Sequence, residues 1–292
     1  MTKTLVLAAV LLTAAAPLWA DDDTAETRSY AAKHRLSLAE KQRALVEEIS
    51  EAACMVAKDI ETQAHLALID KLRGRYLRVH AGLRQGDTEL DLHGEETASK
   101  VLRAMDRVES VWQPHGAAVD RVVATGAVSD GDATQLFDDD AIMLEALAGL
   151  IGAVEGAYAN PADMLLANAV TIDLAARQEM LITAIGKDVC LLVLGWEVDK
   201  HRVSLEQELA LFQASHQALY AGMPAMGIAA APTPQIKAGW EDFMGKWSRL
   251  RPVIDAALGG ERVDDATLAD FNRRNIALLE DLDAILELYE RL

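Results

Sequence analysis

The sequence predicts an all-α protein, built as two tandem antiparallel four-helix bundles that form an internal pseudo-dimer. Hydrophobic residues make up 51% of the chain of 292 residues but aromatic residues only 5%, and this composition favours helix over strand. The seven prolines leave long proline-free stretches, as helices require. Several residues also recur at an offset of 135 or 136 residues, which indicates an internal duplication.

Four helices are expected in the first half. The first begins at Ser37, with Glu40 three residues later as in a capping box, and its apolar residues recur at helical spacing as far as Ile60. The other three are expected at about residues 63–83, 97–125 and 133–158, with polar, Gly-containing loops between them.

The second half repeats this order. Helices are expected at about residues 174–194, 200–220 and 236–258, and a fourth runs to the C-terminus. Trp112 corresponds to Trp247 and Asp120 to Asp255 at one constant spacing. Because short connections make consecutive helices antiparallel neighbours, we expect one bundle over residues 21–158 and another over residues 159–292.

The N-terminus has the pattern of a signal peptide covering residues 1–20. Lys3 precedes a short apolar run that ends at a small residue, Ala20. This pattern predicts export to the periplasm, and an uncleaved N-terminal anchor is the alternative. No later segment is expected to have the ~18 or more apolar residues of a membrane span.

The charge and the motif content exclude several classes of function. A formal charge of −18 argues against nucleic acid and against an anionic membrane surface, and solvated helix faces explain it. The seven histidines have no metal-binding spacing, and no nucleophile elbow, phosphate loop or CxxC motif occurs. We therefore expect no enzyme activity, no cofactor and no metal.

Two short segments carry the most specific pattern. "LAEKQRAL" (residues 38–45) and "LAARQEML" (residues 174–181) share Leu, Ala, Gln and the final Leu, and each leads into an apolar helix. The pattern resembles the PilJ-like domain, the N-terminal sensor domain of type IV pili methyl-accepting chemotaxis transducers, which is similar to periplasmic nitrate/nitrite sensors. The resemblance implies a dimerising four-helix bundle whose first helices meet at the two-fold axis and, in some members, bind nitrate or nitrite between two arginines.

The family's binding arginine falls on Arg43 in the first half and on Glu179 in the second. The resemblance therefore suggests that these two residues meet across the internal pseudo-two-fold, where the carboxylate would occupy the place of the anion. The alternative is that both are solvated helix charges. A second family arginine falls on Glu48 and Ala184, and neither is basic.

Four neighbouring residues are also candidates for ligand binding. Gln42 and Gln178 could hydrogen-bond to a ligand or to the opposite helix, or could lie on half-exposed faces. Lys41 and Arg177 could supply positive charge near the same end of the helix, or could lie on the solvated surface.

The two cysteines are expected to form a disulfide. Cys54 follows Arg43 by 11 residues and Cys190 follows Glu179 by 11, which is close to three helical turns. If the first helices pack at the pseudo-axis, both thiols point at it, and an exported chain oxidises paired cysteines. Two separate buried thiols are the alternative.

These observations favour a stand-alone periplasmic sensor or ligand-binding protein. It would bind a nitrate-like anion or another small molecule between the two repeats, act as a monomer, and report to a membrane-bound sensor or transporter. The alternative is a structural or assembly factor that binds no ligand and docks another protein through its acidic surface. The Met-containing loop "AGMPAMGIAAAPTP" (residues 221–234) could provide such a contact.

Overall fold

The structure is a computed structural model that describes residues 25–158 and 166–291, with side chains from residues 30 and 170 onward. The predicted signal peptide and the segment 159–165 between the halves lie outside the described residues. The main helices are α1 (Ala25–Ala57), α2 (Thr62–Gln85), α3 (Ser99–Thr125), α5 (Asp140–Tyr158), α6 (Leu166–Leu194), α7 (Val198–Ala221), α8 (Pro234–Trp247), α9 (Arg251–Leu258) and α10 (Asp265–Glu290). No strand occurs within this range, so the predicted all-α class is confirmed.

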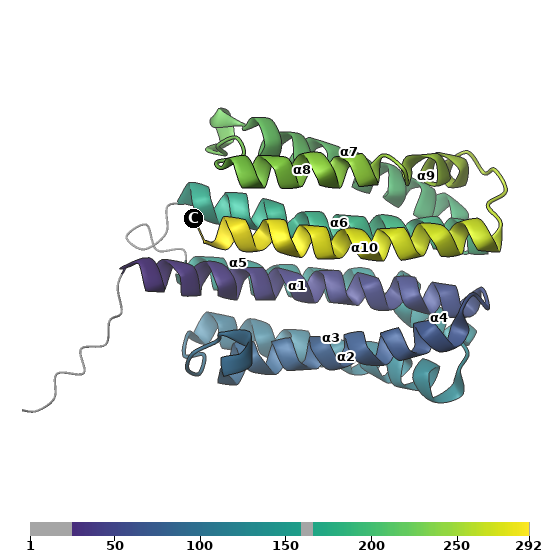
Figure 1. The fold of residues 1–292 in the computed structure, drawn as a ribbon. Helices are drawn as coiled ribbons and strands as arrows, with labels where there is room; N and C mark the ends of the chain where they lie inside the picture. Colours follow the sequence, from purple (N-terminus) through teal and green to yellow (C-terminus); the bar gives the residue numbers. More distant parts are fainter. Residues whose placement is uncertain (1–24, 159–165, 292) are drawn as a thin grey trace, which may run out of the picture.

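Helices α1 and α6 pack against each other in the middle of the molecule (Figure 1). Helix α1 also contacts α2 and α5, and α3 contacts both of these. On the other side, α6 contacts α7, α9 and α10, and α10 contacts α8. The first helices of the two sequence halves therefore form the contact between two groups of helices.

Helix α1 begins earlier than predicted. Residues 25–36 contain neither Gly nor Pro, and Ala32 and Leu36 are buried, so the helix continues through them. Ser37 lies buried inside α1 and Glu40 is 1% exposed. The predicted capping box at Ser37 is therefore wrong, and Glu40 has a different role.

Two predicted helices are interrupted. The stretch 236–258 is divided between α8 and α9, because Pro252 has no N–H and lies in the first turn of α9. The stretch 133–158 begins with the short helix α4 (Asp130–Ala133) and a π-helical turn, η2 (Thr134–Asp138), before α5 starts. Pro114, in contrast, lies inside α3.

The same local geometry occurs in both halves, at the separation of 136 residues that divides Cys54 from Cys190. Glu61 before α2 and Glu197 before α7 both have left-handed φ, at 44° and 36°. Gly86 after α2 and Gly222 after α7 have φ of 82° and 83°. Each glycine is followed by a 3₁₀ turn that is closed by an isolated antiparallel β-bridge. In the first half these are η1 (Thr88–Leu90) and the bridge between Asp87 and Leu92, and in the second half η3 (Pro224–Met226) and the bridge between Met223 and Ile228.

Aromatic packing also repeats. Trp112 of α3 stacks on Tyr76 of α2, with ring centroids 3.9 Å apart. Trp247 of α8 packs on Phe212 of α7 at 4.5 Å. Each tryptophan therefore contacts a ring from the preceding main helix of its own half, and such pairs add specificity beyond the area that they bury.

One stretch within the described residues, Asp130–Tyr158, has the length and hydropathy of a membrane span. The expectation that no later segment passes this test is therefore wrong. Leu147, Leu150 and Val154 of this stretch are buried in the core, and core helices of soluble proteins have the same composition. Length and hydropathy thus do not assign this helix to a membrane.

Candidate functional site

The interface between α1 and α6 contains the predicted disulfide. Cys54 of α1 and Cys190 of α6 are bonded, with Cα atoms 6.2 Å apart. Because both cysteines face the opposite helix, residues at three-, four- and seven-residue spacings from them lie at the same contact.

This interface is unusually rich in buried charge. Seven ionisable side chains of α1 and α6 are less than 9% exposed there: Glu40, Lys41, Glu47 and Glu51 from α1, and Glu179, Lys187 and Asp188 from α6. A buried charge is strongly unfavourable unless it is paired and hydrogen-bonded. The ion-pair and hydrogen-bond partners of these seven groups therefore determine their charge states and whether any of them could bind a ligand.

The predicted contact between Arg43 and Glu179 is replaced by another ion pair. Glu179 pairs with Lys41, whose Nζ also lies 2.7 Å from Oδ1 of Asp283 in α10. Lys41 is 6% exposed and Glu179 2%, so this pair is buried between the helices. The second half thus supplies a carboxylate at the interface, but its partner is Lys41.

Arg43 lies in a second group of charges, with one arginine and one carboxyl from each helix. Its Nη1 is 3.3 Å from Glu40 of α1, and Arg177 of α6 is 3.0 Å from Asp173. Burial raises the pKa of Glu40 to about 8, against the effect of Arg43, and a hydrogen bond with Asp173 raises it further. At neutral pH the Glu40 carboxyl is therefore protonated and donates to Asp173 across the interface.

The two glutamines of the repeated motif point into their own halves. Oε1 of Gln42 accepts from Nδ1 of His80 in α2 at 2.9 Å. Nε2 of Gln178 donates to the Ser215 hydroxyl of α7 at 2.5 Å. The structure therefore places them at equivalent positions but does not bring them together.

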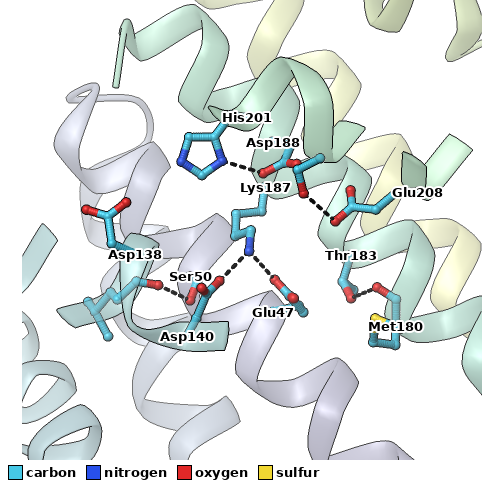
Figure 2. A network of polar contacts seen from close by, with 12 residues as sticks. Glu47, Ser50, Asp138, Asp140, Met180, Thr183, Lys187, Asp188, His201 and Glu208 are labelled. Carbon is cyan, nitrogen blue, oxygen red and sulfur yellow. Dashed lines mark hydrogen bonds and ion pairs between the residues drawn. The ribbon is translucent and has the colours of Figure 1, made fainter. Parts of the chain in front are cut away.

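Lys187 is the centre of a larger cluster (Figure 2). Its Nζ reaches from α6 to Glu47 of α1, at 2.8 Å, and to Asp140, the first residue of α5. Burial lowers the pKa of Lys187, but Glu47 and Asp140 outweigh it and hold that pKa well above its usual value. One ammonium group thus joins three helices.

Two more carboxyls face this cluster. Asp188, which follows Lys187, binds Nδ1 of His201 at 2.7 Å. Glu208 of α7 has a raised pKa because it is buried and close to Asp188. Burial also raises the pKa of Glu47 to about 7, although Lys187 opposes this. Acidic groups therefore outnumber the cations, and protons balance part of their charge.

A fourth group surrounds Glu51. Its carboxyl accepts from Nδ2 of Asn272 at 2.8 Å and from Nδ2 of Asn275 at 3.4 Å, both from α10. Asn275 also donates to the carbonyl of Ile182 in α6, at 3.2 Å. Burial is the main cause that raises the pKa of Glu51 to about 8.

Gly186 of α6 has no side chain, and this leaves room for Glu51 and Asn275 beside it. Gly186→Ala is therefore expected to lower the free energy of unfolding by about 1–3 kcal/mol. A Cβ atom there would overlap Nδ2 of Asn275 and Oε1 of Glu51. Urea denaturation measures the change. Gly149→Ala is the matched control, because a Cβ on that exposed glycine meets nothing within 4 Å and should be neutral or stabilising. Equal effects of the two substitutions would contradict this role of Gly186.

Most of the charged cluster was missed from the sequence, although a signal existed. Glu40, Glu47 and Cys54 are spaced by seven residues and Glu51 by four from Glu47, so they share one face of α1. Carboxylates on the face of a predicted buried cysteine indicate a polar helix contact. Asp140, in contrast, reaches Lys187 through an irregular turn that no spacing predicts.

The fold and this interface define an all-helical protein whose two halves meet through a disulfide and buried ion pairs. Residues 163–270 match the family model PilJ, described as the N-terminal domain of type IV pili methyl-accepting chemotaxis transducers. This part of the chain, which includes Arg177, Gln178 and Glu179, is therefore a PilJ-like domain of sensor type. No curated protein and no solved structure matches the chain.

Proposed function

We propose that this protein is an exported sensor whose two halves form an internal pseudo-dimer around α1 and α6. The local geometry that recurs at Glu61 and Glu197, and at Gly86 and Gly222, supports a duplication. The match to a chemotaxis transducer sensor domain supports a signalling role with a membrane-bound partner. In this proposal a single chain supplies both sides of the family's dimer contact.

The ligand that best fits the interface is a small oxoanion of the nitrate type. The observation that carries this proposal is the group formed by Glu40, Asp173 and the two arginines, one from each helix. Both arginines lie close enough to Glu40 to lower its pKa, and burial keeps it protonated at neutral pH. The two guanidinium groups then face Asp173, with Glu155 of α5 also close to Arg177, and a planar anion would bind their remaining N–H groups through parallel hydrogen bonds.

In this arrangement Arg177 takes the role that the resemblance assigned to the position of Glu179. Nε of Arg43 and Nε of Arg177 are buried and have no hydrogen-bond partner among the described residues. These N–H groups are donors that an anion could use. Lys41 and Glu179 would then stabilise the helix contact beside the site, and Gln42 and Gln178 would position the helices from inside each half.

Nitrate titration by calorimetry tests the proposal. Saturable binding is expected at pH 7, and Arg43→Ala or Arg177→Ala should weaken it roughly 10- to 100-fold, because each removes a charge-assisted hydrogen bond. Arg274→Ala is the control, since Nε of Arg274 already pairs with Asp270 on the exposed surface of α10. Affinity should fall above about pH 8, where Glu40 ionises and competes with the anion. Glu40→Gln should remove this pH dependence.

The alternative is an assembly factor without a ligand. Met223 and Met226, next to and within η3, are 41% and 63% exposed, as a protein contact would require. Absence of binding for nitrate, nitrite and other small anions would overturn the anion proposal and favour this alternative.

A further inference from the structure

A pocket lies in the first half, away from the α1–α6 interface. Its volume is about 240 Å³, and it lies between α3, η2 and the start of α5. Apolar side chains make most of its wall, among them Val111 of α3 and Met143 of α5, and Ile142 is 51% exposed at its opening. The anion proposal does not use this pocket.

His115 of α3 is the principal polar group of the wall. It is 1% exposed, and neither ring nitrogen makes a well-formed hydrogen bond among the described residues, although the main chain of Gln135 lies close to the ring. Burial lowers its pKa to about 4, although Asp140 and the main chain of Gln135 favour the charged form. At neutral pH the ring is therefore uncharged, with one N–H donor and one acceptor nitrogen available.

An unpaired buried imidazole is unfavourable, because each unsatisfied polar group costs about 1–3 kcal/mol. Structures retain such groups where they have a purpose, and binding a ligand group is one. The main chain around His115 is irregular as well. Pro114 removes a helical N–H, and η2 is a π-helical turn, a feature that is frequent at functional sites.

We propose that this pocket binds one ring-sized, mostly apolar small molecule that carries a single hydroxyl group, which hydrogen-bonds to His115. The size fits, because an engineered cavity of about 150 Å³ binds benzene and this pocket is larger. The polarity fits too, because a mostly apolar wall with a few polar groups selects an apolar ligand that carries one polar group. An anionic ligand is disfavoured, because Asp139 lines the pocket and no lining residue is a cation.

The pocket is placed to affect the cluster around Lys187. Asp139 lines it, and the next residue, Asp140, pairs with Lys187. His115 also interacts electrostatically with both Asp140 and Lys187. An occupant would thus contact the turn between η2 and α5, whose residue Asp140 pairs with Lys187 of α6.

Phenol and benzene are the probes, titrated separately into the full chain with ¹³C-methyl labels on Met and Ile. We expect saturable shifts at the methyl groups of Met143 and Ile142, and none at Met223, which is distant in sequence and exposed in the η3 loop. Phenol should bind about 2- to 12-fold more tightly than benzene, as one net hydrogen bond provides.

Two variants test separately the hydrogen bond to His115 and access to the pocket. His115→Leu introduces the residue found at the corresponding position of the second half, Leu250, and should abolish the preference for phenol while benzene still binds. Ile142→Trp changes an exposed residue, so the protein should still fold, and it should weaken both probes by obstructing the opening. The proposal is overturned if the wild-type protein shows no saturable shift at Met143. It is also overturned if His115→Leu leaves the preference for phenol unchanged.

Discussion

Lys187→Met is expected to lower the free energy of unfolding by about 3–5 kcal/mol, the usual cost of removing one partner from a buried ion pair. Met nearly preserves the volume, so the loss comes from charge. Glu47 and Asp140 would lose the ammonium that holds them, and Asp188 and Glu208 lie close to the same site. Urea denaturation, followed by circular dichroism, measures the change.

Lys200→Met is the matched control. Lys200 of α7 reaches Asp138, two residues before Asp140, but its side chain is 47% exposed. Exposed pairs of this kind contribute about 0–1 kcal/mol. Equal losses for the two lysine variants would contradict the buried role of Lys187.

The effect of Lys187→Met should depend on pH in a defined direction. Burial raises the pKa of Glu47 to about 7, above its unfolded value, although Lys187 lowers it. The folded protein therefore holds a proton that the unfolded chain releases near pH 4.5, and stability falls as pH rises through the folded pKa. Without Lys187 this pKa rises further, so the loss should be larger at pH 8.5 than at pH 5.5. A loss that is independent of pH would show that packing is its cause.

The fold could be predicted because its determinants are local. Apolar residues at helical spacing, and loops rich in Gly and Pro, determine helices wherever they pack. The start of α1 was misplaced because Ser37 can form a cap but is not required to, and tertiary packing of Leu36 extends the helix past it. The division between α8 and α9 follows from Pro252, which was visible in the sequence.

The interface could be predicted only in part, because the rotation of each helix is set by packing on all sides. Successive residues differ by about 100° around a helix, so Lys41 and Arg43 project in different directions. The resemblance implied that the first helices meet, and the equal spacing of Cys54 from Arg43 and of Cys190 from Glu179 placed both thiols at that contact, where the disulfide is confirmed. Whether Lys41 or Arg43 meets Glu179 depends on the relative rotation of α1 and α6, which no spacing within one helix determines.

The buried carboxyls were missed for a related reason. A glutamate on a helix is usually solvated, and apart from the spacing to Cys54 nothing local distinguishes Glu47 or Glu51 from Glu145, which is exposed on α5. They are buried because Lys187 and Asn272 arrive from distant parts of the chain. Such partners become visible only when the helices are assembled.

Loss of the disulfide is expected to lower the free energy of unfolding about as much as Lys187→Met does, but for a different reason. The double variant Cys54→Ala/Cys190→Ala removes a cross-link between residues 136 apart, and the chain-entropy model gives a loss of about 5 kcal/mol at most. The model attributes this loss to the unfolded chain, which becomes freer. Urea denaturation measures it, and the double variant should show no further change with reductant, whereas the wild-type protein should.

The polar character of the α1–α6 interface predicts that the disulfide also stabilises the native contact between the two halves. Because Lys41, Glu179 and Lys187 occupy positions at the α1–α6 contact, the contact gains less from apolar burial than one with apolar residues at those positions would. The cross-link should then matter to the native state as well, and the variant should lose its cooperative transition, with the two halves unfolding at different urea concentrations. A single cooperative transition with a loss below about 1 kcal/mol would show instead that the ion pairs hold the halves together unaided and that the unfolded chain is already compact.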